Sequence, residues 1–195
     1  MSTIEKYHYG KDKKTYELQV AQGMLRVEWP EGLSVREVDP TLENFMPLIN
    51  RVSLKWHWNR QERYNDGSLE AKLAHPETRL FELCDSDKAV GYAFITSPGQ
   101  SLKDRFWAAA RNERVIEIEN LGLFPGEEGG GRGKKFFEMF FDRLFKEYDV
   151  VYWSQNNVHS PSLSEFYRER LGMTLLATDQ VKDFRPPESL SNRAA

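Results

Sequence analysis

The sequence predicts a single α/β domain in which helices pack against a central sheet. Strand-like alternation and helical spacing of apolar residues are interspersed along the chain, and no internal repeat is present. Its 195 residues fit one domain with a substantial core. A third observation is local: the segment 115–148 runs from an apolar strand through a glycine-rich loop into a helix with an aromatic stripe.

The first half of the chain contains both kinds of pattern, separated by turn residues. The expected elements are one or two strands over 16–29, a strand over 33–38, a helix over 41–52, a helix over 69–74, and a hairpin of 79–84 with 89–96. Asp39-Pro40 ends the strand before the first helix, and His75-Pro76 ends the second helix. The aromatic segment 56–58 follows the first helix.

The second half carries the most regular patterns. The expected elements are a connector over 97–113, a strand over 115–124, a helix over 132–148, a strand over 150–153, a helix over 162–170, and a last strand over 173–181. We therefore divide the chain into an N-terminal extension (1–30, with one or two added strands), the main domain (31–185) and a mobile tail (186–195).

Composition argues against several functional classes. Lys and Arg number 27 against 30 Asp and Glu, and this balance does not provide the basic face of a general nucleic-acid binder. No apolar stretch approaches the roughly 20 residues of a membrane span, and the first residues lack the apolar core of a secretory signal, so we expect a cytoplasmic protein without a membrane partner. Cys84, the only cysteine, lies in a strand-like run and is interpreted as a core residue.

The glycine-rich loop is the most informative motif. Gly129-Gly130-Gly131-Arg132-Gly133-Lys134-Lys135 joins a strand to a helix, and such a junction directs backbone N–H groups and the positive end of the helix dipole at one point. A Walker P-loop does not fit, because Lys135 follows Gly133-Lys134 where Ser or Thr is required. The dinucleotide pattern G-x-G-x-x-G does not fit either, because a pattern that starts at Gly131 has Phe136 in its last position.

Residues 115–173 resemble the core of the GNAT superfamily of N-acetyltransferases, whose loop has the pattern Q/R-x-x-G-x-G/A. The resemblance implies a central mixed, mostly antiparallel sheet flanked by helices and splayed at the strand before the loop, with the distortion near Gly122. It also implies that backbone groups of Gly129–Lys134 hold the pyrophosphate of acetyl-CoA and that Leu123 meets the thioester arm. Glu128 stands where the family has Gln or Arg, so we expect its side chain to point outward.

A second motif follows the 150–153 strand. Asn157 precedes a short loop, a Phe166-Tyr167 pair and Leu171-Gly172-Met173. By the same resemblance, Asn157 would contribute to cofactor binding and Tyr167 would be the general acid beside the CoA sulfur. The three-residue spacing from Tyr167 to Leu171 also resembles glyoxalase-type proteins, although no second module and no suitable arrangement of histidines is present.

Acyl transfer to an amine also needs a base and an acceptor site. Glu117 and Glu119 share one face of their strand unless a bulge intervenes. Positional resemblance favours Glu117 as the base over Glu119, while a solvated polar face or an ion pair to a helix remains the alternative for both. By resemblance the acceptor groove is bordered by Trp56, Trp58 and Arg60, which could equally be core and surface residues.

The resulting functional prediction is an N-acyltransferase that moves an acetyl group from acetyl-CoA to a primary amine of a small molecule or protein, without a metal. Two alternatives stay open. One is a non-catalytic acyl-CoA-binding or regulatory protein with the same fold, and the remote one is a glyoxalase-like metal enzyme. The sequence does not fix the acceptor or the oligomeric state, and a homodimer remains open.

Overall fold

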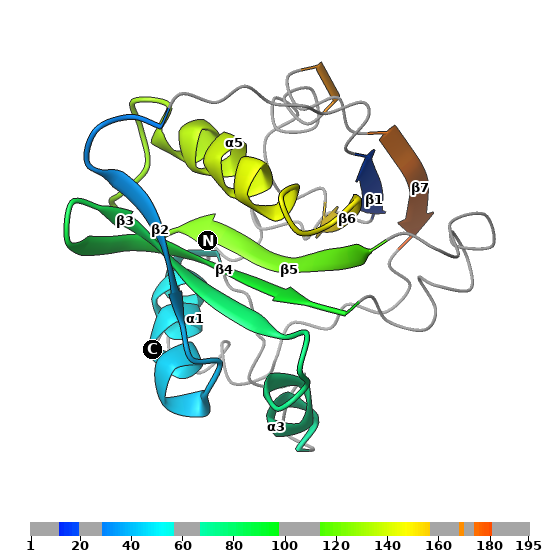
Figure 1. Cartoon of the computed structure of the whole chain (residues 1–195), viewed down its shortest axis with the longest axis horizontal. Coiled ribbons are helices and arrows are strands. Elements are labelled where there is room, and N and C mark those ends of the chain that lie inside the picture. Colours follow the sequence, from blue (N-terminus) through cyan, green and yellow to red (C-terminus); the bar gives the residue numbers. More distant parts are fainter. Residues whose placement is uncertain are drawn as a thin grey trace, which may run out of the picture.

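The computed structural model describes residues 12–19, 29–56, 67–97, 114–156, 168–169 and 174–180. Its elements, in chain order, are β1 (Asp12–Gln19), β2 (Leu33–Val38), α1 (Leu42–Trp56), α3 (Ser68–Leu73), β3 (Arg79–Asp85), β4 (Lys88–Thr96), β5 (Val115–Leu123), α5 (Arg132–Leu144), β6 (Val150–Asn156) and β7 (Thr174–Gln180) (Figure 1). Helices and strands are therefore interspersed along the described chain, as the sequence predicts.

The described strands form one seven-stranded sheet in the order β2-β3-β4-β5-β6-β1-β7 (Figure 1). Every neighbouring pair is antiparallel except β5 and β6, which are parallel. The prediction of a mixed, mostly antiparallel sheet is confirmed. Strand β1 falls within the segment 1–30 and lies between β6 and β7, bonded to both. It begins four residues before the predicted 16–29 segment, of which 20–28 lie outside the described residues.

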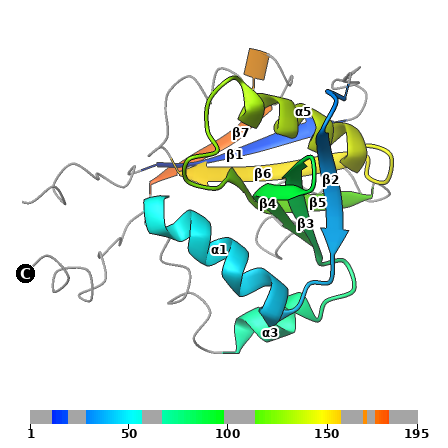
Figure 2. The same ribbon diagram turned by 90° about the vertical axis from the view of Figure 1, so that its left-hand side faces the viewer.

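Helices cover both faces of the sheet: α5 lies on one face, and α1 and α3 lie on the other (Figure 2). Two apolar clusters fill the spaces between these layers. The α5 cluster includes Ile116, Ile118 and Phe140, whereas the α1/α3 cluster includes Phe45 and Phe94. The two clusters use alternate residues of the same strands, because successive side chains of a strand point to opposite faces. We call these faces the α5 face and the α1/α3 face.

Helix α5 buries one aromatic side because its apolar residues recur at helical spacing. Phe136, Phe140 and Leu144 are buried against the sheet. The sequence predicts a helix to residue 148, but regular α-helix ends at Leu144. Beyond it, the N–H groups of residues 146 and 147 donate to carbonyls three residues back, so the chain tightens into a turn.

Helix α1 begins where the sequence predicts. The Thr41 hydroxyl accepts a hydrogen bond from the Asn44 N–H at 3.2 Å, which caps the first turn. Buried apolar residues then recur at three- and four-residue intervals and face the sheet: Phe45, Leu48, Ile49 and Val52. The helix continues to Trp56, four residues beyond the predicted end, so the first aromatic of the 56–58 segment is helical.

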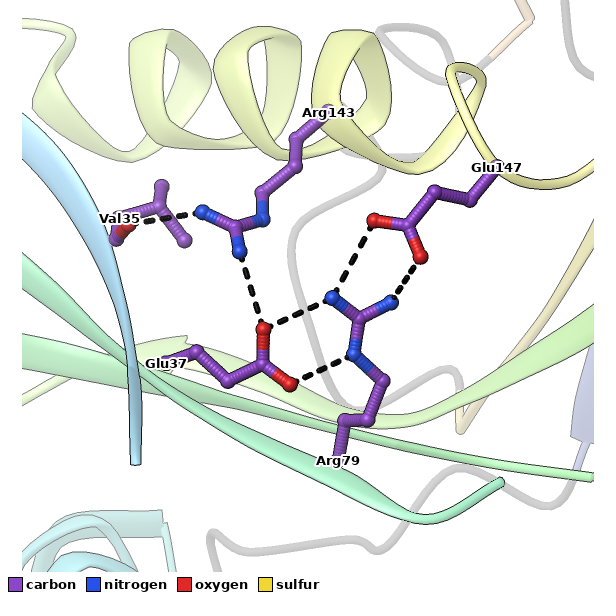
Figure 3. Close-up of polar contacts among 5 residues, drawn as sticks. All are labelled: Val35, Glu37, Arg79, Arg143 and Glu147. Atoms are coloured by element: carbon purple, nitrogen blue, oxygen red, sulfur yellow. Dashed lines mark hydrogen bonds and ion pairs between the residues drawn. The ribbon is translucent and has the colours of Figure 1, made fainter. Parts of the chain in front are cut away.

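A network of charges ties β2, β3 and the C-terminal end of α5 together (Figure 3). Arg79 donates to both Glu37 oxygens at 2.8 Å and to Glu147 at 2.6 Å. Arg143 adds a bond to Glu37 at 3.0 Å and one to the Val35 carbonyl at 3.1 Å. The hydrogen bonds from Arg79 hold the pKa of Glu37 below its ordinary value.

Candidate functional site

The glycine loop between β5 and α5 has a conformation that requires glycine. Gly129, Gly130 and Gly131 have φ values of 113°, 58° and 74°. These values lie in the left-handed region, which is costly for residues with a Cβ. A Cβ at any of the three would have no atom within 4 Å. Backbone geometry, rather than crowding, therefore accounts for the glycines, and the space beside them is open.

Backbone donors are exposed at this junction. Helix α5 has no side-chain cap at Gly131. The N–H groups of Gly130, Gly131 and Gly133 donate no hydrogen bond to any part of the chain that the structure describes. Unsatisfied N–H groups at the start of a helix, together with the positive end of its dipole, favour an anion. The loop thus has the chemistry of a phosphate cradle.

Charged side chains anchor this loop to the β3–β4 turn. The Arg132 guanidinium contacts Asp85 at 3.0 Å and Glu127 at 3.2 Å, and Lys88 bonds the same Glu127 carboxylate. The Lys88 ammonium is the main cause of the lowered pKa of Glu127. These contacts direct the Arg132 side chain toward the hairpin, so only its backbone belongs to the α5 N-terminus.

Glu128, which stands where the resembled family has Gln or Arg, folds back along the loop. Its Oε2 accepts a hydrogen bond from the Gly126 N–H at 2.8 Å. The carboxylate is exposed, and this hydrogen bond holds it beside the backbone of the residue two positions earlier in the chain. This geometry gives Glu128 a structural role at the start of the loop.

Strands β5 and β6 part just before the loop. Their parallel pairing runs from Val115 opposite Val150 to Ile118 opposite Trp153, whereas β5 continues to Leu123. The Phe124 N–H donates to the Val90 carbonyl of β4 at 2.8 Å. Successive N–H groups of a strand point to opposite edges, so the Leu123 N–H is directed toward the edge that β6 has left. The splay predicted for this strand is therefore present.

A β-bulge lies at Glu119, three residues before Gly122, where the resemblance placed the distortion. Ile118 pairs with Ile95 and Asn120 pairs with Phe94, so Glu119 is the extra residue of β5. Gly122 pairs regularly with Tyr92. A bulge inserts one residue and so changes which side chains share a face.

Both carboxylates predicted as bases lie on the α1/α3 face. Glu117 pairs with Thr96, whose hydroxyl is 3.5 Å from that of Thr78 beside α3. Glu119 accepts a hydrogen bond from Lys72 of α3 at 2.7 Å. Glu119 is therefore engaged in an ion pair to a helix, which was the alternative interpretation of these residues. Glu117 is half-buried on the same face.

The bulge also brings Asn120 to this face, and the sequence analysis missed it. Asn120 lies opposite Phe94, which belongs to the α1/α3 cluster. It is 1% exposed, and neither its Oδ1 nor its Nδ2 has a hydrogen-bond partner among the described residues. An unsatisfied buried amide costs about 1–3 kcal/mol, so such a group needs an explanation. Only the bulge, which the sequence pattern does not reveal, places it there.

Several predicted site residues cannot be placed. Tyr167, Asn157, Trp58 and Arg60 lie outside the described residues, as does the side chain of Trp56. Their roles remain predictions. The described residues add two neighbours that the sequence analysis did not identify. Arg51 of α1 lies over the Phe124 ring, 3.7 Å from its centroid, and Tyr152 of β6 lies opposite Glu117.

Two further observations concern reactive groups. Cys84 is buried in β3, and burial raises the pKa of its thiol, which does not suit a nucleophile. Within the described residues, no group of three or more His, Cys, Asp and Glu side chains is arranged to hold a metal ion. No helix in that part of the chain is long and apolar enough to cross a membrane.

No protein-family model and no curated protein matches the sequence. Solved structures do. A GCN5-related N-acetyltransferase (GNAT) from Kribbella flavida aligns over 86% of this chain and 55% of its own, with a TM-score of 0.54 and 13% identity. An aminoglycoside acetyltransferase from an uncultured soil metagenomic sample, in complex with sisomicin, aligns over 81% and 97%, with a TM-score of 0.53 and 17% identity.

A functionally unknown conserved protein from Staphylococcus epidermidis aligns over 90% of this chain and 61% of its own, with a TM-score of 0.56 and 11% identity. The chain thus spans about half to three-fifths of the Kribbella and Staphylococcus chains. At these identities the likeness is one of fold. The chain has the fold of the GCN5-related N-acetyltransferases, as the glycine loop and the sheet predict.

Proposed function

We propose that this protein is an acyl-CoA-dependent N-acyltransferase that transfers the acetyl group of acetyl-CoA to a primary amine by direct attack in a ternary complex. One arrangement carries the proposal. A glycine loop with free backbone donors opens α5 at the point where β5 has parted from β6. This combination offers an anion cradle next to an open strand edge, on a fold shared with acetyltransferases.

The cradle suits the pyrophosphate of acetyl-CoA. The N–H groups of Gly130, Gly131 and Gly133 would donate to phosphate oxygens, and the dipole of α5 would add to their attraction. Lys134 and Lys135 supply positive charge in the first turn. The residues Gly129–Lys134 would therefore hold the donor, with Asn157 contributing as the resemblance implies.

The thioester would lie along the free edge of β5. The Leu123 N–H is directed to this edge, where it would donate to the carbonyl oxygen and stabilise the oxyanion of the tetrahedral intermediate. Gly133 lies close by, since a Cβ there would be 3.6 Å from a methyl group of Leu123. The Leu123 side chain thus lies beside Gly133, so the proposed oxyanion donor is next to the proposed pyrophosphate cradle.

Transfer requires the amine to lose a proton and the thiolate to gain one. The amine nitrogen attacks the thioester carbonyl, the C–N bond forms, the C–S bond breaks, and CoA leaves as a thiol. We assign Glu117 as the base, acting directly or through water, on its positional resemblance, and Glu119, which is bonded to Lys72, is the second choice. Tyr167 would protonate the leaving thiolate. The acceptor would approach from the α1/α3 face, bordered by Trp56, Trp58 and Arg60.

A non-catalytic acyl-CoA-binding protein is the second candidate, since the fold alone does not fix activity. The glyoxalase-like alternative requires paired βαβββ modules, whereas the described strands form one sheet with a single parallel pair. A measurement of turnover distinguishes the acyltransferase from the acyl-CoA-binding protein. A binding protein would retain acetyl-CoA without releasing CoA thiol in the presence of any amine.

The test is CoA thiol release from acetyl-CoA with a panel of kanamycin, spermidine, tyramine and a lysine-containing peptide. We expect amine-dependent thiol release that Glu117→Gln reduces about a hundredfold or more, within the range of general-base catalysis. A Glu82→Gln variant is the matched control, because Glu82 lies on β3 and pairs with Arg36 on the surface. Acetyl-CoA binding without thiol release for every amine would favour the binding protein.

A further inference from the structure

The amide of Asn120 stands out among the polar groups of the described residues. It is almost fully buried on β5, and both of its hydrogen-bonding atoms lack a partner within the described part of the chain. Native proteins pair nearly all such groups. A buried amide that lacks a partner in one state of a protein is typically hydrogen-bonded in another state, either by a ligand or by an ordered water.

Its position relative to Glu117 is set by the bulge. Asn120 follows Glu117 by three positions, and an odd spacing in a regular strand would place them on opposite faces. Because Glu119 is the extra residue, Glu117 pairs with Thr96 and Asn120 with Phe94, two residues apart on β4. The Cα atoms of Glu117 and Asn120 are therefore about 7 Å apart along one face, because two residues of the partner strand span about that distance.

The bulge is itself held in place. Lys72 of α3 bonds Glu119 at 2.7 Å, and its carbonyl accepts the Thr78 hydroxyl at 2.6 Å. The extra residue is thereby fixed to the helix that covers the α1/α3 face. Bulges commonly redirect a side chain beside an active site. Here the redirected side chain is the unpaired amide, and its neighbour on the strand is the proposed base.

We infer that Asn120 is an acceptor-binding residue whose Oδ1 accepts a hydrogen bond from the attacking amine and thereby orients it toward Glu117. The inference rests on the proposed function. An amine nucleophile carries N–H donors, and a neutral amide oxygen accepts them without the desolvation cost of a second charge. The Nδ2 group remains available to a polar acceptor atom of the substrate, such as a hydroxyl, carbonyl or amide oxygen. Asn120 would thus favour amines that carry such a group close to the nitrogen.

The experiment compares Asn120→Leu, of nearly the same size, with Asn120→Asp and with the control Ile118→Val. Ile118 adjoins the bulge but faces α5, so its variant perturbs the same strand without touching the acceptor side. Each variant is assayed by thiol release with the panel amine that native protein acetylates fastest, and by thermal unfolding without substrate.

We expect Asn120→Leu to raise the KM for the amine about tenfold or more, the effect of one lost hydrogen bond to a charged or polar group, while the KM for acetyl-CoA stays within twofold. Its melting temperature should equal or exceed that of native protein, because an apolar side chain replaces an unpaired amide. Asn120→Asp, which keeps the acceptor oxygen, should retain more amine affinity than Asn120→Leu. Ile118→Val should leave both KM values unchanged.

An unchanged amine KM in Asn120→Leu would overturn the inference while leaving the proposed function intact. A marked loss of thermal stability in Asn120→Leu would also overturn it, because it would mean that a buried water satisfies the amide in the free protein. Absence of any turnover by native protein would instead contradict the proposed function, and this inference with it.

Discussion

Glu117 and Asn120 lie on the same face of β5 although their spacing in the sequence is odd. The bulge at Glu119 causes this, since Glu117 pairs with Thr96 and Asn120 with Phe94. The face they share is the one that α1 and α3 cover, while the proposed phosphate cradle follows the end of the same strand. Strand β5 therefore carries the proposed base and the proposed acceptor-binding residue, and it leads into the glycine loop proposed to bind acetyl-CoA.

The two carboxylates of β5 should differ in their effect on turnover. Glu117→Gln is expected to reduce kcat about a hundredfold or more, because the base is lost. Glu119→Gln should reduce kcat less than about tenfold, because that carboxylate is bonded to Lys72. Thiol-release kinetics between pH 6 and 9 measure both. The opposite order of effects would assign the base to Glu119.

The Lys72–Glu119 pair should contribute to stability more than to chemistry. Its side chains are partly buried, with 34% and 18% exposed. A double-mutant cycle with Lys72→Met and Glu119→Gln, followed by urea unfolding, should give a coupling energy of about 1 kcal/mol, the upper part of the range for exposed pairs. A coupling energy near zero would show that the pair does not hold the bulge.

Two helix-opening glycines allow backbone strain to be separated from ligand binding. Gly131 and Gly67 have φ values of 74° and 76°, and a Cβ on either would meet no atom within 4 Å. Substitution by Ala should cost about 1 kcal/mol of unfolding free energy at both positions. Only Gly131→Ala should weaken acetyl-CoA binding. Equal loss of binding in Gly67→Ala would show that the effect is general destabilisation.

The charge network of Figure 3 predicts acid sensitivity. Arg79 holds the pKa of Glu37 below its ordinary value, so folding is stabilised above the unfolded pKa of about 4.3, and this contribution is lost as pH falls through the lower, folded value. Glu37→Gln should therefore lower stability at pH 7 by about 1 kcal/mol. It should also reduce the slope of stability against pH below about pH 4.3. Urea unfolding at pH 7 and pH 3 tests this, and an unchanged slope would contradict it.

The fold was predictable where the periodicity is strong. The hairpin of β3 and β4, the strand β5 and the start of α5 fall where alternation, helical spacing and glycines place them. The insertion of β1 between β6 and β7 was not predictable, because pairing between strands distant in sequence leaves no local pattern. The end of α5 was placed four residues too late, since the aromatic stripe continues into the turn after Leu144.

The candidate site, like the fold, was predictable from the sequence only in part. The glycine-rich turn at the start of α5 was predictable, because the positive φ of Gly129, Gly130 and Gly131 selects glycine and leaves a visible motif, and its binding of acetyl-CoA stays a prediction. Asn120 and Lys72 were missed for a physical reason: a bulge turns Asn120 toward the α1/α3 face, and Lys72 reaches β5 from a helix 47 residues earlier. Neither a bulge nor a tertiary ion pair changes the residue pattern from which faces are deduced.

The most direct test is calorimetric titration with acetyl-CoA of native protein, of the double variant Gly131→Glu with Gly133→Glu, and of Gly67→Glu. We expect binding by native protein and by Gly67→Glu, and its loss in the double variant, whose carboxylates would oppose the pyrophosphate at the cradle. Absence of binding by native protein at millimolar acetyl-CoA would overturn the proposal that the glycine loop holds the cofactor, as would undiminished binding by a folded double variant.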